Sequence, residues 1–178
     1  MKLFSRKILA VCTIGLILSV PHLFAEDGKN ASGAAPASTE AKMMTNSDVE
    51  TLIKVTDQAA TEKKADLMEP LLADDLKVIV TNVPSPQGPQ KMEMKKSDYL
   101  QTLKQTWEAA EKYEYQKKDV AIELAKDGKS AVVKDTIIEK LTISGKTIET
   151  TTKEMATIEF RNGKPQITIL EGEMVEMK

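Results

Sequence analysis

Three carboxylates are the side chains of this sequence best placed to do chemistry. Asp135, Glu154 and Glu171 lie in three successive segments in which apolar and polar residues alternate, as they do in β-strands. If Ser144-Gly145 and Asn162-Gly163 form two-residue hairpin turns, the three side chains stand abreast on one face of a sheet. Crowding and desolvation would raise the pKa of such a cluster, which suits a general base or acid, or a cation-binding site.

The rest of that face is apolar, whereas the opposite face is charged. Thr150 and Thr152 add hydroxyls beside the carboxylates and are candidate ligand-binding residues. The opposite face pairs Lys140 with Glu149. The first face is therefore predicted to be the concave, helix-facing one. Its rows read Val120, Asp135, Glu154 and Glu171, then Ile122, Val133, Ala156 and Ile169, then Leu124, Ala131, Ile158 and Ile167.

A β-bulge would change this interpretation. Long bent strands usually contain one, and a single extra residue turns the following side chains to the other face. Gly172 is a candidate bulge, and a bulge near Val133 or Met155 would place the acids in solvent. Two interpretations therefore stay open, an acidic pocket and a solvated outer face.

Two aromatic residues are further ligand-binding candidates. Tyr99 and Trp107 fall in a predicted helix that begins at Ser97, where Leu100 and Leu103 repeat at helical spacing. This spacing fits packing in the core as well as stacking against a ligand, so both roles stay open.

The first 25 residues have the pattern of a secretory signal peptide. Lys2, Arg6 and Lys7 form a basic start, residues 8–20 are an apolar run of 13 residues, and Ala25 is a small residue before the predicted cut. The run is shorter than the roughly 20 residues that a membrane-spanning helix needs. We therefore expect an exported protein, periplasmic or secreted, with no membrane attachment after signal removal.

Removing the signal peptide changes the chemistry open to the protein. The single cysteine and single histidine, Cys12 and His22, lie within it, and its loss shifts the net charge from −2 to −5. The exported protein would have no thiol and no imidazole. This excludes disulfides, thiol catalysis, Ser-His triads and most zinc, copper or haem sites, so no cofactor and no metal are expected.

The acidic balance also argues against nucleic acid as a partner, because phosphate binding needs clustered lysine and arginine. Lysine pairs such as Lys117-Lys118 are isolated in the sequence, and we interpret them as solvated edges of helices or strands. Phosphate loops, nucleophile elbows, EF-hand loops and dinucleotide-binding turns are not found in the sequence.

An ordered domain is expected to begin at Ser47. Residues 26–46 are rich in Ala, Ser, Gly, Asn and Lys without an apolar period, which predicts a flexible linker. Ser47 and Glu50 have the spacing of a capping box that opens a helix over residues 47–63. A short helix is predicted from Asp66, a strand over residues 76–80, a stiff proline loop over residues 84–89 and a third helix capped by Ser97.

From Tyr113 onward the period changes to two, which predicts a meander of strands. The turn dipeptides Asp127-Gly128, Ser144-Gly145 and Asn162-Gly163 leave middle strands of about 15 residues, against the usual five or six. Straight strands of that length would reach about 50 Å. A globule of this size has a radius of gyration of only about 14 Å, so the sheet must bend around the helices.

This order of helices and long strands resembles the nuclear transport factor two-like superfamily, also called the SnoaL-like or cystatin-like cone. The resemblance covers residues 47–178 and includes residues 65–75, ADLMEPLLADD, which are similar to the family's second helix and its run into the first strand. It implies an α+β fold in which a cone-shaped, curved antiparallel sheet wraps around three N-terminal helices. It also implies a pocket between sheet and helices, and often a dimer.

Members of this superfamily serve as enzymes or as binding scaffolds. Its catalytic members mostly use a pocket histidine, or an acid paired with a tyrosine from the first helix, and residues 47–178 offer neither. We therefore expect an exported small-molecule-binding or interaction protein. The alternative is a lyase or isomerase in which Asp135, Glu154 or Glu171 serves as base or acid. The expected partners are a small apolar or cationic ligand and a second copy of the chain, paired through an exposed sheet face or edge.

Overall fold

The structure, a computed structural model, describes residues 43–178. The predicted signal peptide, residues 1–25, lies outside the described residues, as does most of the predicted linker. Within residues 43–178, no helix has the length and apolar character needed to cross a bilayer.

Helix α1 (Asn46–Glu62) begins one residue earlier than predicted, because another residue caps it. The Thr45 hydroxyl accepts a hydrogen bond from the Asp48 backbone N–H at 3.2 Å, and the Asp48 carboxylate accepts one from the Thr45 N–H at 2.9 Å. The predicted capping box of Ser47 and Glu50 is therefore wrong. Met44, just before the cap, is only 2 % exposed, so the packed domain begins before the predicted end of the linker.

Two short helical turns and one longer helix complete the helical layer. α2 (Ala65–Met68) runs into a 3-10 turn, η1 (Glu69–Leu71), where Pro70 is tolerated because it stands at the start of the turn. α3 (Lys96–Ala109) also begins one residue before its predicted start, and the predicted cap by Ser97 is wrong because no side chain caps this helix.

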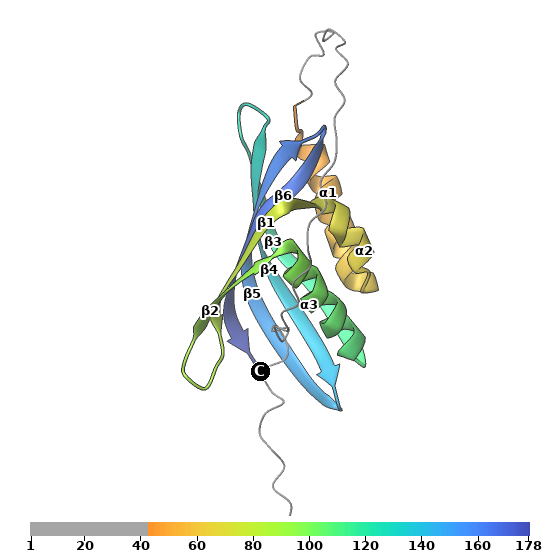
Figure 1. Cartoon of the computed structure of the whole chain (residues 1–178), viewed down its shortest axis with the longest axis vertical. Coiled ribbons are helices and arrows are strands. Elements are labelled where there is room, and N and C mark those ends of the chain that lie inside the picture. The colour runs from red at the N-terminus through yellow and green to blue at the C-terminus, as the bar shows by residue number, and fades with distance from the viewer. Residues whose placement is uncertain (1–42) are drawn as a thin grey trace, which may run out of the picture.

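Six strands form one bent sheet, in the order β2-β1-β6-β5-β4-β3. Their bounds are β1 (Leu72–Val83), β2 (Gln90–Lys95), β3 (Lys112–Leu124), β4 (Ser130–Ile143), β5 (Lys146–Arg161) and β6 (Lys164–Met177). β1 pairs with β6 in parallel and all other neighbours are antiparallel, so the sheet is mixed rather than antiparallel as predicted. Figure 1 shows the helices on one side of the curved sheet, which confirms the predicted α+β cone.

The hairpin turns follow the predicted chemistry with one difference. Ser144-Gly145 and Asn162-Gly163 are two-residue turns in which all four residues have positive φ, the backbone that asparagine and glycine favour. The turn at Asp127-Gly128 is longer: Ala125 N–H donates to the Ser130 carbonyl, and residues 126–129 lie between them. A four-residue turn leaves the strands paired as the predicted two-residue turn would, with Leu124 opposite Ala131.

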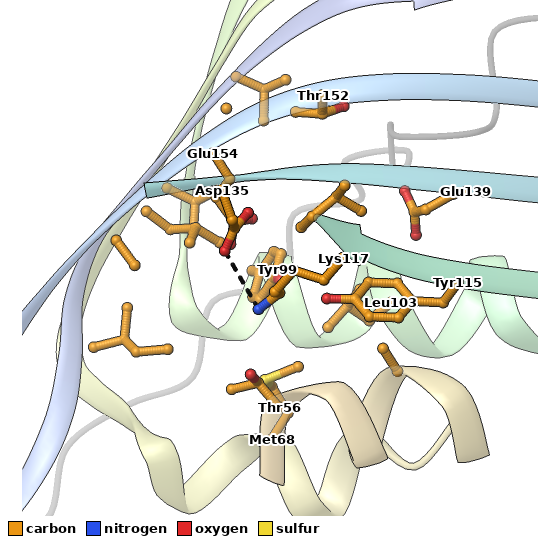
Figure 2. Close-up of a pocket in the computed structure, with 18 of the residues that line it drawn as sticks. Thr56, Met68, Tyr99, Leu103, Tyr115, Lys117, Asp135, Glu139, Thr152 and Glu154 are labelled. Atoms are coloured by element: carbon orange, nitrogen blue, oxygen red, sulfur yellow. Dashed lines mark ion pairs between the residues drawn. The ribbon is translucent and has the colours of Figure 1, made fainter. Parts of the chain in front are cut away.

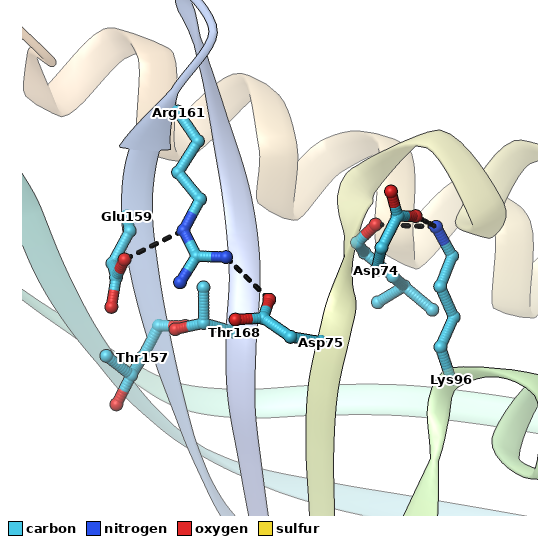
Figure 3. Close-up of polar contacts among 8 residues, drawn as sticks. Asp74, Asp75, Lys96, Thr157, Glu159, Arg161 and Thr168 are labelled. Atoms are coloured by element: carbon cyan, nitrogen blue, oxygen red, sulfur yellow. Dashed lines mark hydrogen bonds and ion pairs between the residues drawn. The ribbon is translucent and has the colours of Figure 1, made fainter. Parts of the chain in front are cut away.

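Three bulges shift the predicted register farther along the strands, one in β3 and two in β6. In β3 the shift falls between Lys118 and Ala121, and Asp119 there has a φ of 55°. In β6 the first shift falls between Ile167 and Ile169, where the extra residue is Thr168, and the second falls between Met174 and Glu176. Figure 3 shows the Thr168 hydroxyl beside Thr157 of β5, to whose carbonyl it donates a hydrogen bond at 3.3 Å. Each bulge reverses which residues face the helices beyond it.

The core lies between the concave face of the sheet and the helices. Val49 and Leu52 of α1 belong to a buried cluster with residues of β1, β4, β5 and β6, and partly buried residues of β2 and β3 pack against it. The most deeply buried large side chains are Met44, Val49, Leu72, Val78 and Ile158. On the rim, Arg161 of β5 reaches across β6 to pair with Asp75 of β1 and also pairs with Glu159 (Figure 3). Lys96 joins α3 to β1 through Asp74 at 2.9 Å.

The chain segment before α1 is held against the β3–β4 turn, which makes one glycine important. The Met44 N–H donates to the Gly128 carbonyl at 2.8 Å, and a Cβ on Gly128 would lie 2.6 Å from the Met43 Cβ. We expect Gly128→Ala to lower the free energy of unfolding by about 2–3 kcal/mol, through left-handed strain and displacement of this segment. Chemical denaturation measures the change.

Gly145→Ala is the matched control for this substitution. Gly145 also has positive φ, but a Cβ there meets no atom within 4 Å, so only strain of about 1 kcal/mol is expected. Equal losses in the two variants would contradict the packing of the Met43–Met44 segment on the turn.

Candidate functional site

A cavity of about 180 Å³ lies between the concave face of the sheet and the helices. Leu52, Met68 and Leu103 from the helices and Ile158 and Leu170 from the sheet give it mostly apolar walls. Charged side chains from β3, β4 and β5 gather in its lining, where Lys117 pairs with Asp135 (Figure 2). Since a bound water needs only about 10–15 Å³ on this measure, the cavity has room for a small organic molecule.

Two of the three predicted carboxylates meet in this cavity. Asp135 of β4 pairs directly with Glu154 of β5, because the Ser144-Gly145 hairpin keeps its register without a bulge over its whole length. Asp135 is 7 % exposed and Glu154 is half-buried. Thr150 and Thr152 lie on the same face and line the same cavity, as the alternation predicted.

Glu171 does not join them, which corrects the predicted three-acid row. The bulge at Thr168 places Gly172 opposite Glu154 and turns Glu171 to the outer face, opposite Met155. Glu171 instead lines a shallow hollow on that outer face with Lys153 and Glu173. Leu170 takes the inner position that was predicted for Ile169, for the same reason.

A lysine takes the place of the missing acid, and the sequence interpretation of it was wrong. The bulge at Asp119 leaves Val120 exposed, although it was predicted on the inner face, and turns Lys117 inward. The Lys117 side chain is 8 % exposed, and its Nζ lies 3.4 Å from Asp135 Oδ2 and 3.0 Å from Asp57 Oδ1. Lys118 remains exposed on the outer face, as expected of a solvated strand edge.

Asp57 enters the site from α1 and was not predicted as a site residue. It accepts a hydrogen bond from the Tyr115 hydroxyl at 3.1 Å in addition to its ion pair with Lys117. Asp57, Lys117, Asp135 and Glu154 together form what we call the acid–lysine cluster. It joins α1 to three strands through charged groups rather than apolar contacts.

A second polar pair lines the cavity. The Tyr113 hydroxyl of β3 donates a hydrogen bond to the Glu139 carboxylate of β4. Burial raises the pKa of Glu139, against the lowering effect of that hydrogen bond. Tyr113 also contacts Trp107 edge to face, with ring centroids 6.2 Å apart.

Burial and mutual repulsion set the protonation of the acid–lysine cluster. Burial, reinforced by the charge of Asp135, raises the pKa of Glu154 to about 8. Burial also raises the pKa of Asp135, although Lys117 opposes the shift. Burial alone would lower the pKa of Lys117, but the charges of Glu154, Asp135 and Asp57 outweigh it and raise that pKa. Lys117 is therefore charged at neutral pH and Glu154 is largely protonated.

One oxygen of the cluster has no partner. Asp135 Oδ1 is buried and accepts no hydrogen bond, and among the side-chain atoms of residues 43–178 it alone is in this state. The other Asp135 oxygen is held by Lys117. Leaving a buried acceptor unpaired costs about 1–3 kcal/mol, so the oxygen marks a place where a bound group would gain energy.

The two aromatic candidates are both at the cavity. Trp107 is buried and packs with Ala60 and Ala65, while part of its surface lines the cavity. Tyr99 is half-buried, packs against the main core and also lines the cavity (Figure 2). Both therefore contribute to packing in the way the helical spacing indicated.

In the described part of the chain, no three acidic side chains are arranged to hold a metal ion.

The sequence did contain a signal for the residues that were missed. Ile122 and Leu124 are inner-face residues of β3 at even numbers, whereas Tyr113 and Tyr115 are large side chains at odd numbers. The inner face thus changes from odd-numbered to even-numbered residues within one strand, which requires a one-residue bulge between Tyr115 and Ile122. Lys117, at an odd number before such a bulge, then faces inward. The approach of Asp57 has no such signal, because it depends on how α1 packs on the sheet.

Comparison by sequence finds no relative that identifies the chain. It matches no protein-family model. It also matches no curated protein.

Comparison by structure finds many matches. A hexachlorocyclohexane dehydrochlorinase from Novosphingobium barchaimii LL02 is 12% identical with a TM-score of 0.58, covering 74% of this chain and 87% of that one. A proposed scytalone dehydratase from Novosphingobium aromaticivorans DSM 12444 is 10% identical with a TM-score of 0.60, covering 74% and 85%.

A nuclear transport factor two-like protein from Cytophaga hutchinsonii ATCC 33406 is 19% identical with a TM-score of 0.58, covering 74% of this chain and 100% of that one. At these identities the similarity concerns the fold and not the activity. With its bent six-stranded sheet, its helices on the concave side and these structural relatives, the chain has the nuclear transport factor two-like cone fold.

Proposed function

We propose that this protein is exported and binds a small organic molecule inside its cone. One observation supports this most strongly: an apolar cavity whose lining includes a buried charged cluster with one oxygen unpaired. Ligand sites in proteins have this form, with apolar walls that supply affinity and a few polar groups that fix orientation. Export rests on the signal-peptide pattern of residues 1–25.

The energetics of the cluster support a functional role. Burying charged groups in a core costs free energy of folding, and a protein in which apolar residues of similar volume replace them is often equally stable or more stable. Lys117, Asp135 and Glu154 nevertheless line a cavity rather than lie in a filled core. Thr150 and Thr152 add hydroxyls on the same face, so a ligand would find both hydrogen-bond acceptors and donors.

A second candidate function is proton transfer, as in a lyase or isomerase. The pKa of Glu154, raised to about 8, would let it exchange a proton near neutral pH. Asp135 beside it is the other candidate, whereas Glu171 faces away from the cavity. Two of the structural relatives bear enzyme names, a dehydratase and a dehydrochlorinase. Turnover of a bound ligand that survives both Glu154→Gln and Asp135→Asn would exclude this candidate.

Thermal unfolding in the presence of a fragment library tests the binding function. At a ligand concentration ten times its Kd, a cavity ligand should raise the Tm by about 4 °C. Leu103 lines the cavity from α3, so Leu103→Trp should fill the space and abolish the shift. Gln105→Trp, on the exposed face of the same helix, is the matched control and should keep it.

Two results would contradict the proposed function. The first is a library in which no fragment stabilises the protein. The second is a set of stabilising fragments that act equally on the wild type and on Leu103→Trp, since these would bind elsewhere.

A further inference from the structure

The acid–lysine cluster contains more acidic groups than basic ones. Asp57, Asp135 and Glu154 face one ammonium group, that of Lys117. Glu139 adds a further carboxyl group to the lining of the same cavity, from the same strand as Asp135. Even with the Glu154 carboxyl protonated at neutral pH, the carboxylates of Asp57 and Asp135 face a single ammonium group, so the site has more acceptors than it has positive charge.

The lysine and tyrosine donors near the cluster are already committed. Lys117 Nζ serves Asp57 Oδ1 and Asp135 Oδ2, and the Tyr115 hydroxyl donates to Asp57. The Tyr113 hydroxyl donates to Glu139. Asp135 Oδ1 receives nothing, although the Asp135 side chain is only 2 % exposed and cannot rely on bulk water.

A ligand that completes this site has to bring a donor, and a positive one. A carboxylate or phosphate would be repelled by the cluster, and a neutral hydroxyl would satisfy the oxygen but leave the charge uncompensated. An ammonium group does both. The rings of Tyr99 and Tyr115 also line the cavity, and aromatic faces attract cations.

We propose that the ligand of this cavity is a small amine, whose ammonium group donates to Asp135 Oδ1 and whose apolar body lies between Leu103 and the sheet. The proposal rests on the proposed binding function and specifies the chemistry of its ligand. A cavity of about 180 Å³ limits the body to the size of one ring or a short branched chain.

The pH dependence of amine binding offers a second test, because neighbouring groups change their ionisation when an ammonium group binds. The titratable groups that face the site are Asp57 of α1, Tyr99 of α3, Tyr113, Tyr115 and Lys117 of β3, Asp135 and Glu139 of β4, and Glu154 of β5. Of these, Glu154 has a pKa of about 8. Since an ammonium group favours ionised Glu154, amine binding should tighten between pH 6 and pH 8.5 and release a proton.

Benzylamine and benzyl alcohol are the probes, because they have nearly the same shape and differ in charge. Calorimetric titration of the full mature chain should give at least about tenfold tighter binding for benzylamine. Asp135→Asn keeps the shape of the side chain and removes its charge, so it should weaken benzylamine about tenfold and benzyl alcohol less than about threefold. Glu149→Gln, on the same strand as Glu154 but on the outer face, is the control and should change neither affinity.

The outcomes separate this inference from the proposed function. Benzyl alcohol binding as tightly as benzylamine, or benzylamine affinity unchanged in Asp135→Asn, would overturn the amine and leave the binding function standing. Binding of neither probe would also overturn the amine, and the fragment screen then decides the binding function. If Asp135→Asn does not fold, Glu154→Gln replaces it and should abolish the tightening of benzylamine binding above pH 7.

Discussion

Replacing Lys117 by methionine is expected to lower the free energy of unfolding by about 3–5 kcal/mol. The methionine side chain fills most of the volume of the lysine, so the loss comes from charge. Asp135 keeps one oxygen unpaired already, and removal of the Lys117 ammonium 3.4 Å away would leave the other unpaired too. Asp57, whose side chain is 37 % exposed, would lose its ion pair at 3.0 Å and keep the Tyr115 hydroxyl and solvent as partners.

Urea denaturation at pH 7 measures this change. Lys118→Met is the matched control, because Lys118 is the next residue in the strand but is exposed on the outer face. The free energy of unfolding of Lys118→Met should stay within about 0.5 kcal/mol of the wild-type value. Similar stabilities for the two variants would contradict the inward position of Lys117, and with it the bulge at Asp119.

The second large effect is on the pH dependence of stability. Burial, together with the charge of Asp135, raises the pKa of Glu154 from 4.5 to about 8 in the folded protein. Between these values the folded state holds a proton that the unfolded state has lost. The stabilisation that this proton on Glu154 gives the folded state is therefore complete below pH 4.5. It is lost as pH rises toward 8, at about 1 kcal/mol per pH unit.

Glu154→Gln should remove this part of the slope, because glutamine imitates the protonated side chain at every pH. Relative to the wild type, the variant should gain about 3 kcal/mol between pH 5 and pH 8. Asp135 and Glu139, whose pKa values burial also raises, keep their own contributions in both proteins. Urea denaturation at half-unit steps of pH gives the two curves.

Glu149→Gln provides the control for the pH experiment. Glu149 is on the same strand, but its pKa is lowered by the hydrogen bond and charge of Lys140 on the outer face. Its contribution has the opposite sign, since it is present above the ordinary pKa and lost as pH falls, so its removal should not flatten the slope above pH 5. Parallel curves for the wild type and Glu154→Gln would contradict the raised pKa of Glu154.

The fold was predictable from the sequence where local signals fix it. The turn dipeptides set the register of β4 against β5, and with it the meeting of Asp135 and Glu154. The strand lengths required a bend, and the apolar face identified the side on which the helices lie. The parallel pairing of β1 with β6 was missed, because it joins strands far apart in the sequence and no turn records it.

The site was only half predictable, and two bulges account for most of what was missed. One extra residue near Thr168 removed Glu171 from the cluster, and one near Asp119 brought Lys117 into it. A bulge needs no particular residue type, so it shows only as a change of phase in the apolar pattern. Asp57 could not be found in this way, because its role depends on the packing of α1 against β3.

A homodimer paired through an exposed sheet face or edge stays a prediction, as do the signal peptide and export. None of the three affects the argument for the cavity, which depends on residues 43–178 alone. The binding function, in contrast, depends entirely on whether a small molecule occupies the space beside Asp135 and Glu154.

A crystal structure of the protein soaked separately with benzylamine and with benzyl alcohol tests that claim most directly. We expect electron density for at least one probe between the sheet and the helices, with its polar atom within about 3.2 Å of Asp135 Oδ1. A cavity closed by side chains would contradict the account, and a cavity that holds only water in both soaks would contradict the amine ligand.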